Sequence, residues 1–190
     1  MTEIAFIRHG MTNWNREKRA QGQSNIPLND EGKHQAKLLA ERLKNETWDL
    51  IISSDLSRAS ETASIIASSL GMSVQVDQRL REMHKGETEG TTQEERIIKW
   101  GEQWESLPLG IEDKDSIINR GTSFVSEIVG KSFGKKVLVV SHGALIGLTV
   151  KHFIPELNIA QHFQNTAITS LMHSELGWEC TLFNCAKHLN

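Results

Sequence analysis

The sequence is poor in cysteine and contains no long apolar run. Only two cysteines stand among its 190 residues, Cys180 and Cys185, and both fall within one expected strand. They differ by an odd number of positions, so their side chains point to opposite faces of that strand and cannot bridge each other. We therefore expect free thiols, as in proteins of the reducing cytoplasm.

Several classes of protein are excluded by what is missing. No stretch of about eighteen apolar residues occurs, so no membrane-spanning segment is expected. The chain runs from Met1 straight into a strand, so no signal peptide is expected. The net charge is -3 and no basic stripe is present, which argues against a nucleic-acid partner. Most histidines are scattered without metal-ligand spacing, so neither a metal nor another cofactor is expected.

Strand and helix signals alternate along most of the chain. This alternation predicts an α/β fold, a three-layer sandwich with a mostly parallel central sheet and helices on both faces. Neither a repeat nor a linker divides residues 1–190, so we expect a single domain. The expected strands cover about 4–7, 49–53, 74–76, 137–140, 166–173 and 178–184, and the expected helices cover about 12–18, from 29 or 30 to 43, 59–70, 91–104, 115–131 and 144–153.

The segment 86–116 is the least regular part of the sequence. It contains several glycines, Pro108, Trp100 and Trp104. We expect a lid or capping insertion here. Its two tryptophans either anchor it on the core or line an apolar wall beside a ligand.

Two short motifs follow apolar strands that lie far apart in the sequence. Arg8-His9-Gly10 follows residues 4–7, and Ser141-His142-Gly143 follows residues 137–140. In open α/β sheets, ligands bind in the crevice outside the carboxyl ends of the strands. The two histidines can therefore meet in one crevice, and the adjacent arginine indicates that they meet around an anion, above all a phosphate.

Arg8 and His9 are together suited to phosphoryl chemistry. The planar guanidinium of Arg8 stays charged and matches two phosphate oxygens. About three-quarters of an ordinary histidine is neutral at pH 7, and a fixed positive neighbour raises that fraction. A ring nitrogen of His9 is then free to attack phosphorus. The other interpretation is that both side chains only cap the end of the sheet.

Groups that follow His9 are expected to bind the same anion. Gly10 lets the backbone approach the ligand closely. The start of the helix that follows offers unpaired N–H donors. Asn15, one helical turn after Thr12, offers its side-chain amide to the same oxygens.

Three further side chains complete the expected site. Arg58 falls in the first turn of a helix, where a positive charge opposes the helix dipole, and an anion held by it would explain its place. Glu82 follows a short strand and can protonate a leaving oxygen. Glu87 and Glu89 are close enough in sequence to compete for that role. His142 can hydrogen-bond a phosphoryl oxygen as charge develops on it.

These motifs together resemble the histidine phosphatase superfamily, the family of cofactor-dependent phosphoglycerate mutases and related phosphatases. The matching stretches occur in family order and span most of the chain. They are Phe6-Ile7-Arg8-His9-Gly10-Met11-Thr12 with Asn15, Gln21-Gly22, Ile26-Pro27-Leu28, Gly32 with Gln35-Ala36, Ser53-Ser54 to Arg58-Ala59 with Thr62-Ala63, Leu80-Arg81-Glu82 with Glu89-Gly90, and Ser141-His142-Gly143.

The resemblance implies a phosphatase that acts on a small phosphorylated metabolite through a phosphohistidine. It implies that His9 is the nucleophile, that Glu82 is the proton donor and that no metal takes part. Asn165 resembles a family position near the phosphate pocket. The pocket itself is assigned to Arg8, Asn15, Gln21, Gly22, Arg58, His142 and Gly143.

Two other functions stay open at this stage. The first is a cofactor-dependent phosphoglycerate mutase, although the segment 86–116 is short and rich in glutamate, which argues against a second anion site. The second is a regulatory module that binds phosphorylated partners without turnover, against which the complete set of His9, Glu82 and His142 argues.

The sequence departs from the family pattern where the leaving group would lie. Lys85 stands where relatives often carry an aromatic or apolar residue, and Thr88 stands where many have tryptophan. The sequence therefore leaves the alcohol half of the substrate open. It also leaves the oligomeric state open, a homodimer being one arrangement.

Overall fold

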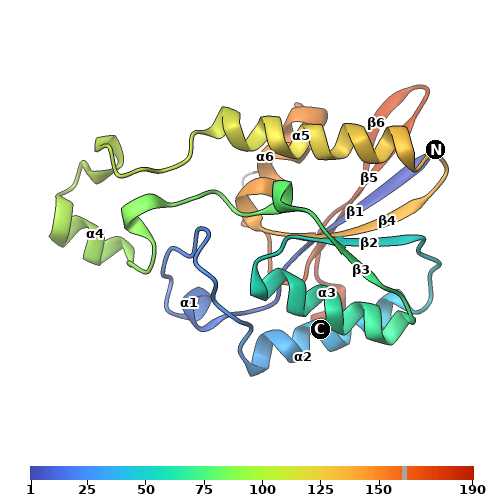
Figure 1. Cartoon of the computed structure of the whole chain (residues 1–190), viewed down its shortest axis with the longest axis horizontal. Coiled ribbons are helices and arrows are strands. Elements are labelled where there is room, and N and C mark those ends of the chain that lie inside the picture. Colours follow the sequence, from blue (N-terminus) through green and yellow to red (C-terminus); the bar gives the residue numbers. More distant parts are fainter. Residues whose placement is uncertain (160–161) are drawn as a thin grey trace.

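The computed structural model of the protein describes residues 1–159 and 162–190. Six strands within these residues form one sheet in the order β3-β2-β4-β1-β5-β6. The four strands from β3 to β1 run parallel (Figure 1). β5 runs antiparallel to β1 and closes the sheet in a hairpin with β6. The strands are β1 (Thr2–Arg8), β2 (Leu50–Ser53), β3 (Val74–Val76), β4 (Lys136–Ser141), β5 (Ile168–Ser174) and β6 (Gly177–Cys185).

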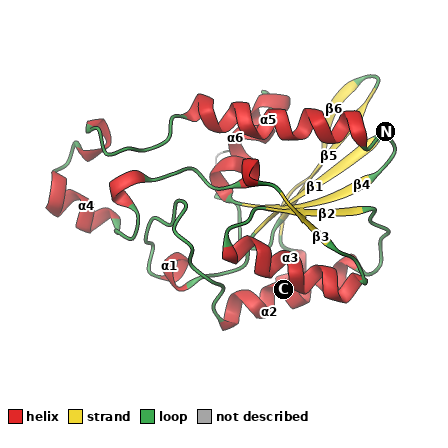
Figure 2. Cartoon of the chain, in the orientation of Figure 1, coloured by secondary structure: helices red, strands yellow, loops and turns green. Residues whose placement is uncertain are grey.

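Helices cover both faces of this sheet (Figure 1, Figure 2). α2 and α3 pack together on one face, and α5 and α6 pack together on the other. The predicted three-layer α/β sandwich with a mostly parallel sheet is confirmed. The helices are α1 (Asn13–Arg16), α2 (Asp30–Leu43), α3 (Ser57–Leu70), α4 (Gln93–Trp100), α5 (Lys114–Lys131) and α6 (Gly143–Phe153).

The central strands build two hydrophobic cores because successive side chains point to opposite faces of a sheet. On β1, Ile4 and Phe6 pack on the side of α5 and α6, whereas Ala5 and Ile7 pack on the side of α2 and α3. Residues 137–140 on β4 are buried in the same alternating way. Each large aliphatic side chain buried in this way contributes about 1.5–3 kcal/mol. The two apolar runs therefore hold β1 and β4 in the middle of the sheet.

The segment 86–116 differs most from its predicted structure. Instead of one helix over 91–104, α4 spans only Gln93–Trp100 and a short 3-10 turn follows at Trp104–Ser106. Gly101 ends α4 because its backbone takes a positive φ of 87°, which a helix cannot continue. In Figure 1 this segment reaches away from the sheet, with α4 at the far left. Its role as a lid stays a prediction, as does the single-domain organisation.

Two features of the described residues bear on the cysteines and on membrane spans. Cys180 and Cys185 are both free thiols. No helix in residues 1–159 and 162–190 combines the length and the apolar character that crossing a membrane requires.

The register of β1 and β4 brings the two sequence motifs together. These strands are parallel neighbours, and Arg8 at the end of β1 pairs with Ser141 at the end of β4. His9 and His142 follow directly, so they leave the sheet side by side. The chain then turns to α2 on one face and to α6 on the other, which opens a crevice between the two strand ends.

Candidate active site

His9 is buried at the end of β1 with one ring nitrogen turned towards a cation. Its side chain is 2% exposed. Nδ1 lies 2.7 Å from the Gly10 carbonyl and donates to it, which leaves Nε2 as the acceptor, 3.3 Å from the Arg58 Nε. Burial, followed by the charges of Arg58 and Arg8, holds the pKa of His9 well below its ordinary value of 6.5. The imidazole is therefore neutral at physiological pH and carries its lone pair on Nε2.

Arg58 occupies the first turn of α3 and is fully buried. Besides His9, its guanidinium donates to the carbonyl oxygens of Gly22 at 2.7 Å and Ser24 at 2.8 Å. Burial lowers its pKa to about 10, so the side chain keeps its charge at neutral pH. No ion pair within the described part of the chain includes Arg58. A charge against the helix dipole, held only by neutral groups, favours an anion beside it.

His142 and Arg8 each present a buried nitrogen without a hydrogen-bond partner. The ring of His142 lies 5.2 Å from that of His9 between centroids. Its Nε2 is 3.0 Å from the Ser54 hydroxyl, whereas its Nδ1 is buried and unpaired. The Arg8 guanidinium donates to the Phe163 carbonyl, while its Nε is buried and unpaired. Buried polar groups normally have partners, so two such atoms at one site point to a ligand with oxygen acceptors.

The pKa values of these two groups are lowered, chiefly by burial. Burial and then the charge of Arg58 hold the pKa of His142 well below 6.5. Burial also lowers the pKa of Arg8, although the carboxylate of Glu82 acts in the opposite direction. A fixed positive charge and a neutral imidazole therefore stand on either side of His9.

The backbone of the loop after His9 is held by side chains of neighbouring helices. Its N–H groups do not point unpaired at a ligand, because Gly10 donates to the Thr62 hydroxyl at 3.0 Å and Met11 donates to the Gln35 side chain at 3.0 Å. A Cβ at Gly10 would lie 2.6 Å from the carbonyl oxygen of Gly32. Gly10 is thus required for packing against the start of α2. At the start of α1 the Asn15 N–H donates to the Thr12 hydroxyl at 3.1 Å, and donation from this helix start to an anion stays a prediction.

Glu82 lies in the loop after β3, and its carboxylate reaches the start of α6. Its carboxylate accepts from the Met83 backbone N–H at 2.8 Å and from the Ala144 N–H at 3.3 Å. It lines the cavity described below together with His9. Glu82 is therefore the acidic side chain at the site, on the same side as the nucleophile candidate.

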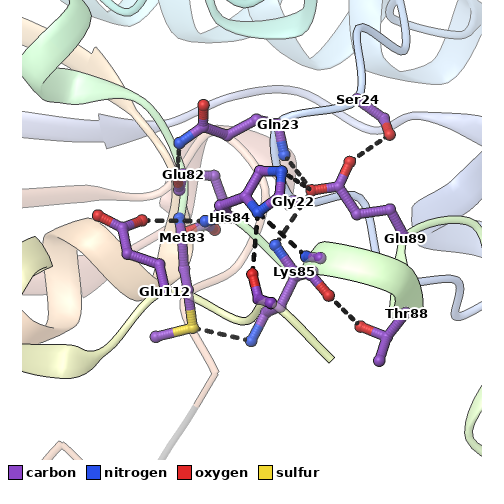
Figure 3. A network of polar contacts seen from close by, with 12 residues as sticks. Gly22, Gln23, Ser24, Glu82, Met83, His84, Lys85, Thr88, Glu89 and Glu112 are labelled. Atoms are coloured by element: carbon purple, nitrogen blue, oxygen red, sulfur yellow. Dashed lines mark hydrogen bonds and ion pairs between the residues drawn. The ribbon is translucent and has the colours of Figure 1, made fainter. Parts of the chain in front are cut away.

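The two competing glutamates are placed differently. Glu87 is exposed and does not line the cavity. Glu89 accepts from the backbone N–H groups of Gln23 at 2.9 Å and Lys85 at 3.0 Å, and from the Ser24 hydroxyl (Figure 3). Burial by itself would raise the pKa of Glu89, but these hydrogen bonds outweigh it and lower the pKa. Glu89 is thus an ionised carboxylate that links the loop around Gln23 and Ser24 to the loop around Lys85.

Gly22 lies directly against the Glu89 side chain, next to Gln23 in the sequence. Its φ is +50°, and a Cβ there would come within 2.0 Å of the Glu89 carboxylate. Its carbonyl is one of the groups that hold Arg58. Only glycine fits this position, and its role here is to support the guanidinium.

Asn15, Gln21 and Asn165 form a polar cluster beside the His9 backbone. Asn15 Oδ1 accepts from the Thr12 N–H at 3.2 Å and from the Asn165 amide at 3.3 Å, so the amide nitrogen is the group that Asn15 can offer to a ligand. Asn165 also donates to the His9 carbonyl at 2.9 Å. Gln21 accepts from the Thr12 hydroxyl at 2.9 Å. Asn15 and Gln21 reach the cavity wall, whereas Asn165 lies behind them.

A cavity of 690 Å³ opens over these residues. This volume falls within the ~300–1,000 Å³ typical of small-molecule sites. His142 is fully buried against His9 rather than on the wall. The predicted residues on the wall are Arg8, His9, Asn15, Gln21, Gly22, Arg58, Glu82 and Gly143.

The remaining wall was not predicted from the sequence. One face of α6 supplies Ala144, Gly147, Leu148 and Lys151, which follow the i, i+3, i+4, i+7 spacing of a helix. Trp100 and Trp104 do not line the cavity; Trp104 is buried under the Arg96 guanidinium, 4.6 Å from its ring centroid. Lys85, which the sequence placed where the leaving group would lie, also lines the cavity, and the other unpredicted members are Arg19, Ala20, Asn158, Ile159, His162 and Phe163.

Within residues 1–159 and 162–190, no group of three or more His, Cys, Asp or Glu side chains is arranged to hold a metal ion. The groups described above are a neutral imidazole nucleophile, fixed cations and one carboxyl group. The absence of a metal requirement stays a prediction.

Comparisons with known proteins point in the same direction. The family model described as histidine phosphatase superfamily (branch 1) matches residues 4–186. Uncharacterized phosphatase PhoE of Bacillus subtilis is 30% identical over 193 residues, which cover 100% of this chain and 98% of that protein. Phosphoglycerate mutase-like protein 4 of Arabidopsis thaliana is 35% identical over 177 residues, covering 87% of this chain and 77% of that protein. The solved structure of a mycobacterial glucosyl-3-phosphoglycerate phosphatase with VO3 is similar at a TM-score of 0.86 and 30% identity, covering 96% of this chain and 98% of that chain.

Proposed function

The chain belongs to the histidine phosphatase superfamily and is a phosphatase, and on that premise we propose that it hydrolyses small phosphorylated metabolites through a phosphohistidine at His9. The observation that carries this proposal is the state of the His9 ring. Its Nε2 is unprotonated, buried and directed at the Arg58 guanidinium 3.3 Å away. A nucleophile beside a fixed cation is suited to attack on a phosphate ester.

In the first step, His9 Nε2 attacks phosphorus in line with the departing alcohol. Arg8 and Arg58 bind the non-bridging oxygens, with Asn15, Gln21 and the N-terminal residue of α6, Gly143, around them. His142 donates to an oxygen whose negative charge grows as phosphorus becomes five-coordinate. Positioning and charge stabilisation then supply most of the rate enhancement.

Glu82 completes both halves of the reaction. As a carboxylic acid it gives its proton to the leaving oxygen while the P–O bond breaks and the P–N bond forms. The resulting carboxylate then takes a proton from water, whose oxygen attacks phosphorus and frees His9. One well-placed acid or base typically contributes about 10²–10⁴-fold.

Phosphate release and a covalent intermediate together test this proposal. Wild-type protein is incubated, with a chelator present, with glycerol 3-phosphate, phosphoserine, 3-phosphoglycerate and p-nitrophenyl phosphate. We expect phosphate release from at least one alkyl ester, and a radiolabelled phosphoryl group on the protein that survives denaturation in alkali. Turnover that stops with the chelator would contradict the metal-free mechanism.

The same experiment separates the two other functions. A phosphoglycerate mutase would interconvert phosphoglycerates, when primed with bisphosphoglycerate, faster than it releases phosphate. A regulatory module would bind phosphate without turnover and would form no covalent adduct. The mycobacterial relative, named a phosphatase, supports hydrolysis as the main reaction of this chain.

We also propose a cytoplasmic location and small metabolites as the binding partners. The free state of Cys180 and Cys185 supports a reducing compartment. A homodimer stays a prediction, for which the molecular mass in solution is the direct measurement.

A further inference from the structure

The charges around the cavity are unevenly matched. Five cationic side chains line it, against one carboxylate, that of Glu82. Two of the cations, Arg8 and Arg58, lie beside His9, where the scissile phosphate of the proposed reaction would bind. The other three are Arg19, Lys85 and Lys151. The whole chain, by contrast, carries a net charge of -3, so this concentration of positive charge is local.

Arg19 is already neutralised by its neighbours. Its guanidinium pairs with Glu17 at 2.9 Å and with Glu95 at 2.6 Å. It also donates to the Gly90 carbonyl at 2.7 Å. Arg19 therefore joins α4 to the cavity wall and has little charge left for a ligand.

Lys85 and Lys151 are in a different situation. Among the described residues, neither ammonium group takes part in an ion pair. The Lys85 Nζ lies 3.0 Å from the Met83 sulfur, a weak acceptor (Figure 3). The Lys151 Nζ donates to the carbonyl oxygens of Pro155 and Leu157. Neither ammonium group therefore has a carboxylate partner among the described residues.

The backbone around Lys85 is held in place. Its N–H donates to the Glu89 carboxylate at 3.0 Å, and the same carboxylate holds the Gln23 N–H at 2.9 Å (Figure 3). Lys85 follows Glu82 by three residues on the same loop, and both side chains line the cavity. A cation at this point interacts with the leaving group rather than with the scissile phosphate.

We propose that Lys85 and Lys151 bind a second anionic group, a carboxylate or a phosphate, carried by the leaving alcohol. This inference rests on the proposed function. A phosphate dianion on His9 matches Arg8 and Arg58, and a second anion matches the two lysines. Leu148, Ile159 and Phe163 supply apolar wall for the carbon skeleton. The cations come from either side of the segment 86–116 and not from within it, so its glutamate-rich composition does not oppose such a site.

Matched pairs of esters test the second anion. 3-Phosphoglycerate and glycerol 3-phosphate have the same carbon chain and differ by one carboxylate. 1,3-Propanediol bisphosphate and propyl phosphate differ by one phosphate. In at least one pair, we expect kcat/KM to be about tenfold or more higher for the ester that carries the second anionic group than for its partner. One charge-assisted hydrogen bond accounts for such a ratio. The pair with the larger ratio identifies the anion, and salt should reduce that ratio.

Single substitutions assign this selectivity to the two lysines. Lys85→Met and Lys151→Met should each lower, about tenfold, the ratio of kcat/KM for the ester with two anionic groups to kcat/KM for the ester with one. Lys85→Arg should keep most of the wild-type ratio. Lys135→Met is the matched control, because Lys135 is exposed at the opposite end of the sheet, before β4. Its ratio should equal that of the wild type. Ratios that are equal to one in the wild type, or unchanged in both lysine variants, would overturn the proposal.

Binding measurements separate this inference from the proposed function. If no ester is hydrolysed, the phosphatase mechanism fails, yet calorimetry still compares the affinities of the two members of each pair. The same titrations are repeated on the His9→Ala variant, which lacks the nucleophile, so that no ester is hydrolysed while its affinity is measured. If the ester with two anionic groups binds more tightly than its partner, and Lys85→Met abolishes this difference, the second anion site is supported even without hydrolysis. Equal affinities for both esters would refute it.

Discussion

The buried groups around His9, which we call the floor of the cavity, and the exposed groups at its edge, which we call the rim, are built in contrasting ways. On the floor, His9, Arg58 and His142 are at most 2% exposed and are held by groups that lie far away in the sequence. On the rim, the side chains of the Arg19–Glu95 ion pair are 28% and 46% exposed. Buried groups with fixed partners keep one geometry, whereas exposed pairs contribute little and are replaced easily. The buried floor therefore keeps a fixed geometry for the proposed phosphoryl chemistry, and we expect the rim to select the substrate.

Replacement of the nucleophile is the strongest test of the floor. His9→Ala should lower kcat by at least ~10⁴-fold, because no other group can form the covalent intermediate. The radiolabelled adduct should disappear with it, while circular dichroism shows a folded chain. His84→Ala is the matched control, since His84 is exposed on the loop that carries Glu82, and it should keep the adduct. A labelled His9→Ala protein would place the nucleophile elsewhere.

The proton donor lies at the border between floor and rim. Glu82→Gln should lower kcat/KM for alkyl phosphates by about 10²–10⁴-fold. Aryl phosphates should lose far less, because their leaving groups need little protonation. Glu87→Gln, on the exposed side of the same loop, should leave both substrate types near the wild-type rate. Equal losses for alkyl and aryl esters in Glu82→Gln would remove Glu82 from the acid role.

The floor was predictable from the sequence because its causes are local. Apolar runs that end in His9 and His142 indicate buried parallel strands, and strand ends of one parallel sheet share an edge. Arg58 was recognisable because a positive charge in the first turn of a helix needs a partner. In the structure the two histidines meet at 5.2 Å, and Arg58 contacts the first of them.

The parts that escaped prediction depend on long-range geometry. The N–H of Gly10 is used by Thr62, a residue 52 positions away, and no local pattern reveals such a partner. The periodicity of α6 shows that Gly147 and Lys151 share a face, but not that this face borders the cavity. That follows only from the direction in which α6 leaves β4. The reacting groups were therefore predictable from the sequence, whereas the part of the wall that α6 supplies was not.

Acid stability measures how firmly the floor is buried. Burial lowers the pKa of His9 and His142 in the folded chain, so below the unfolded value of 6.5 only the unfolded chain takes up these protons. Stability should be full above pH 6.5 and fall as the pH drops. Each histidine should contribute up to about 1.4 kcal/mol of lost unfolding free energy per pH unit. Chemical denaturation at several pH values gives this slope, which should be smaller in His142→Gln and unchanged in His34→Gln, on the exposed face of α2.

The smallest effect should come from the rim. Glu95→Gln removes the Arg19 contact of 2.6 Å that joins α4 to the cavity wall. The pair is exposed, so the thermal unfolding temperature should hardly change. Arg19 then keeps only its ion pair with Glu17 and adds positive charge to the cavity wall, and KM for an ester with a second anionic group should therefore fall a few-fold, with kcat unchanged. Glu102→Gln, on an exposed residue of the same segment, should leave KM as it is. A change in kcat with Glu95→Gln would mean that the rim also helps to position the reacting groups, and the division between floor and rim would then not hold.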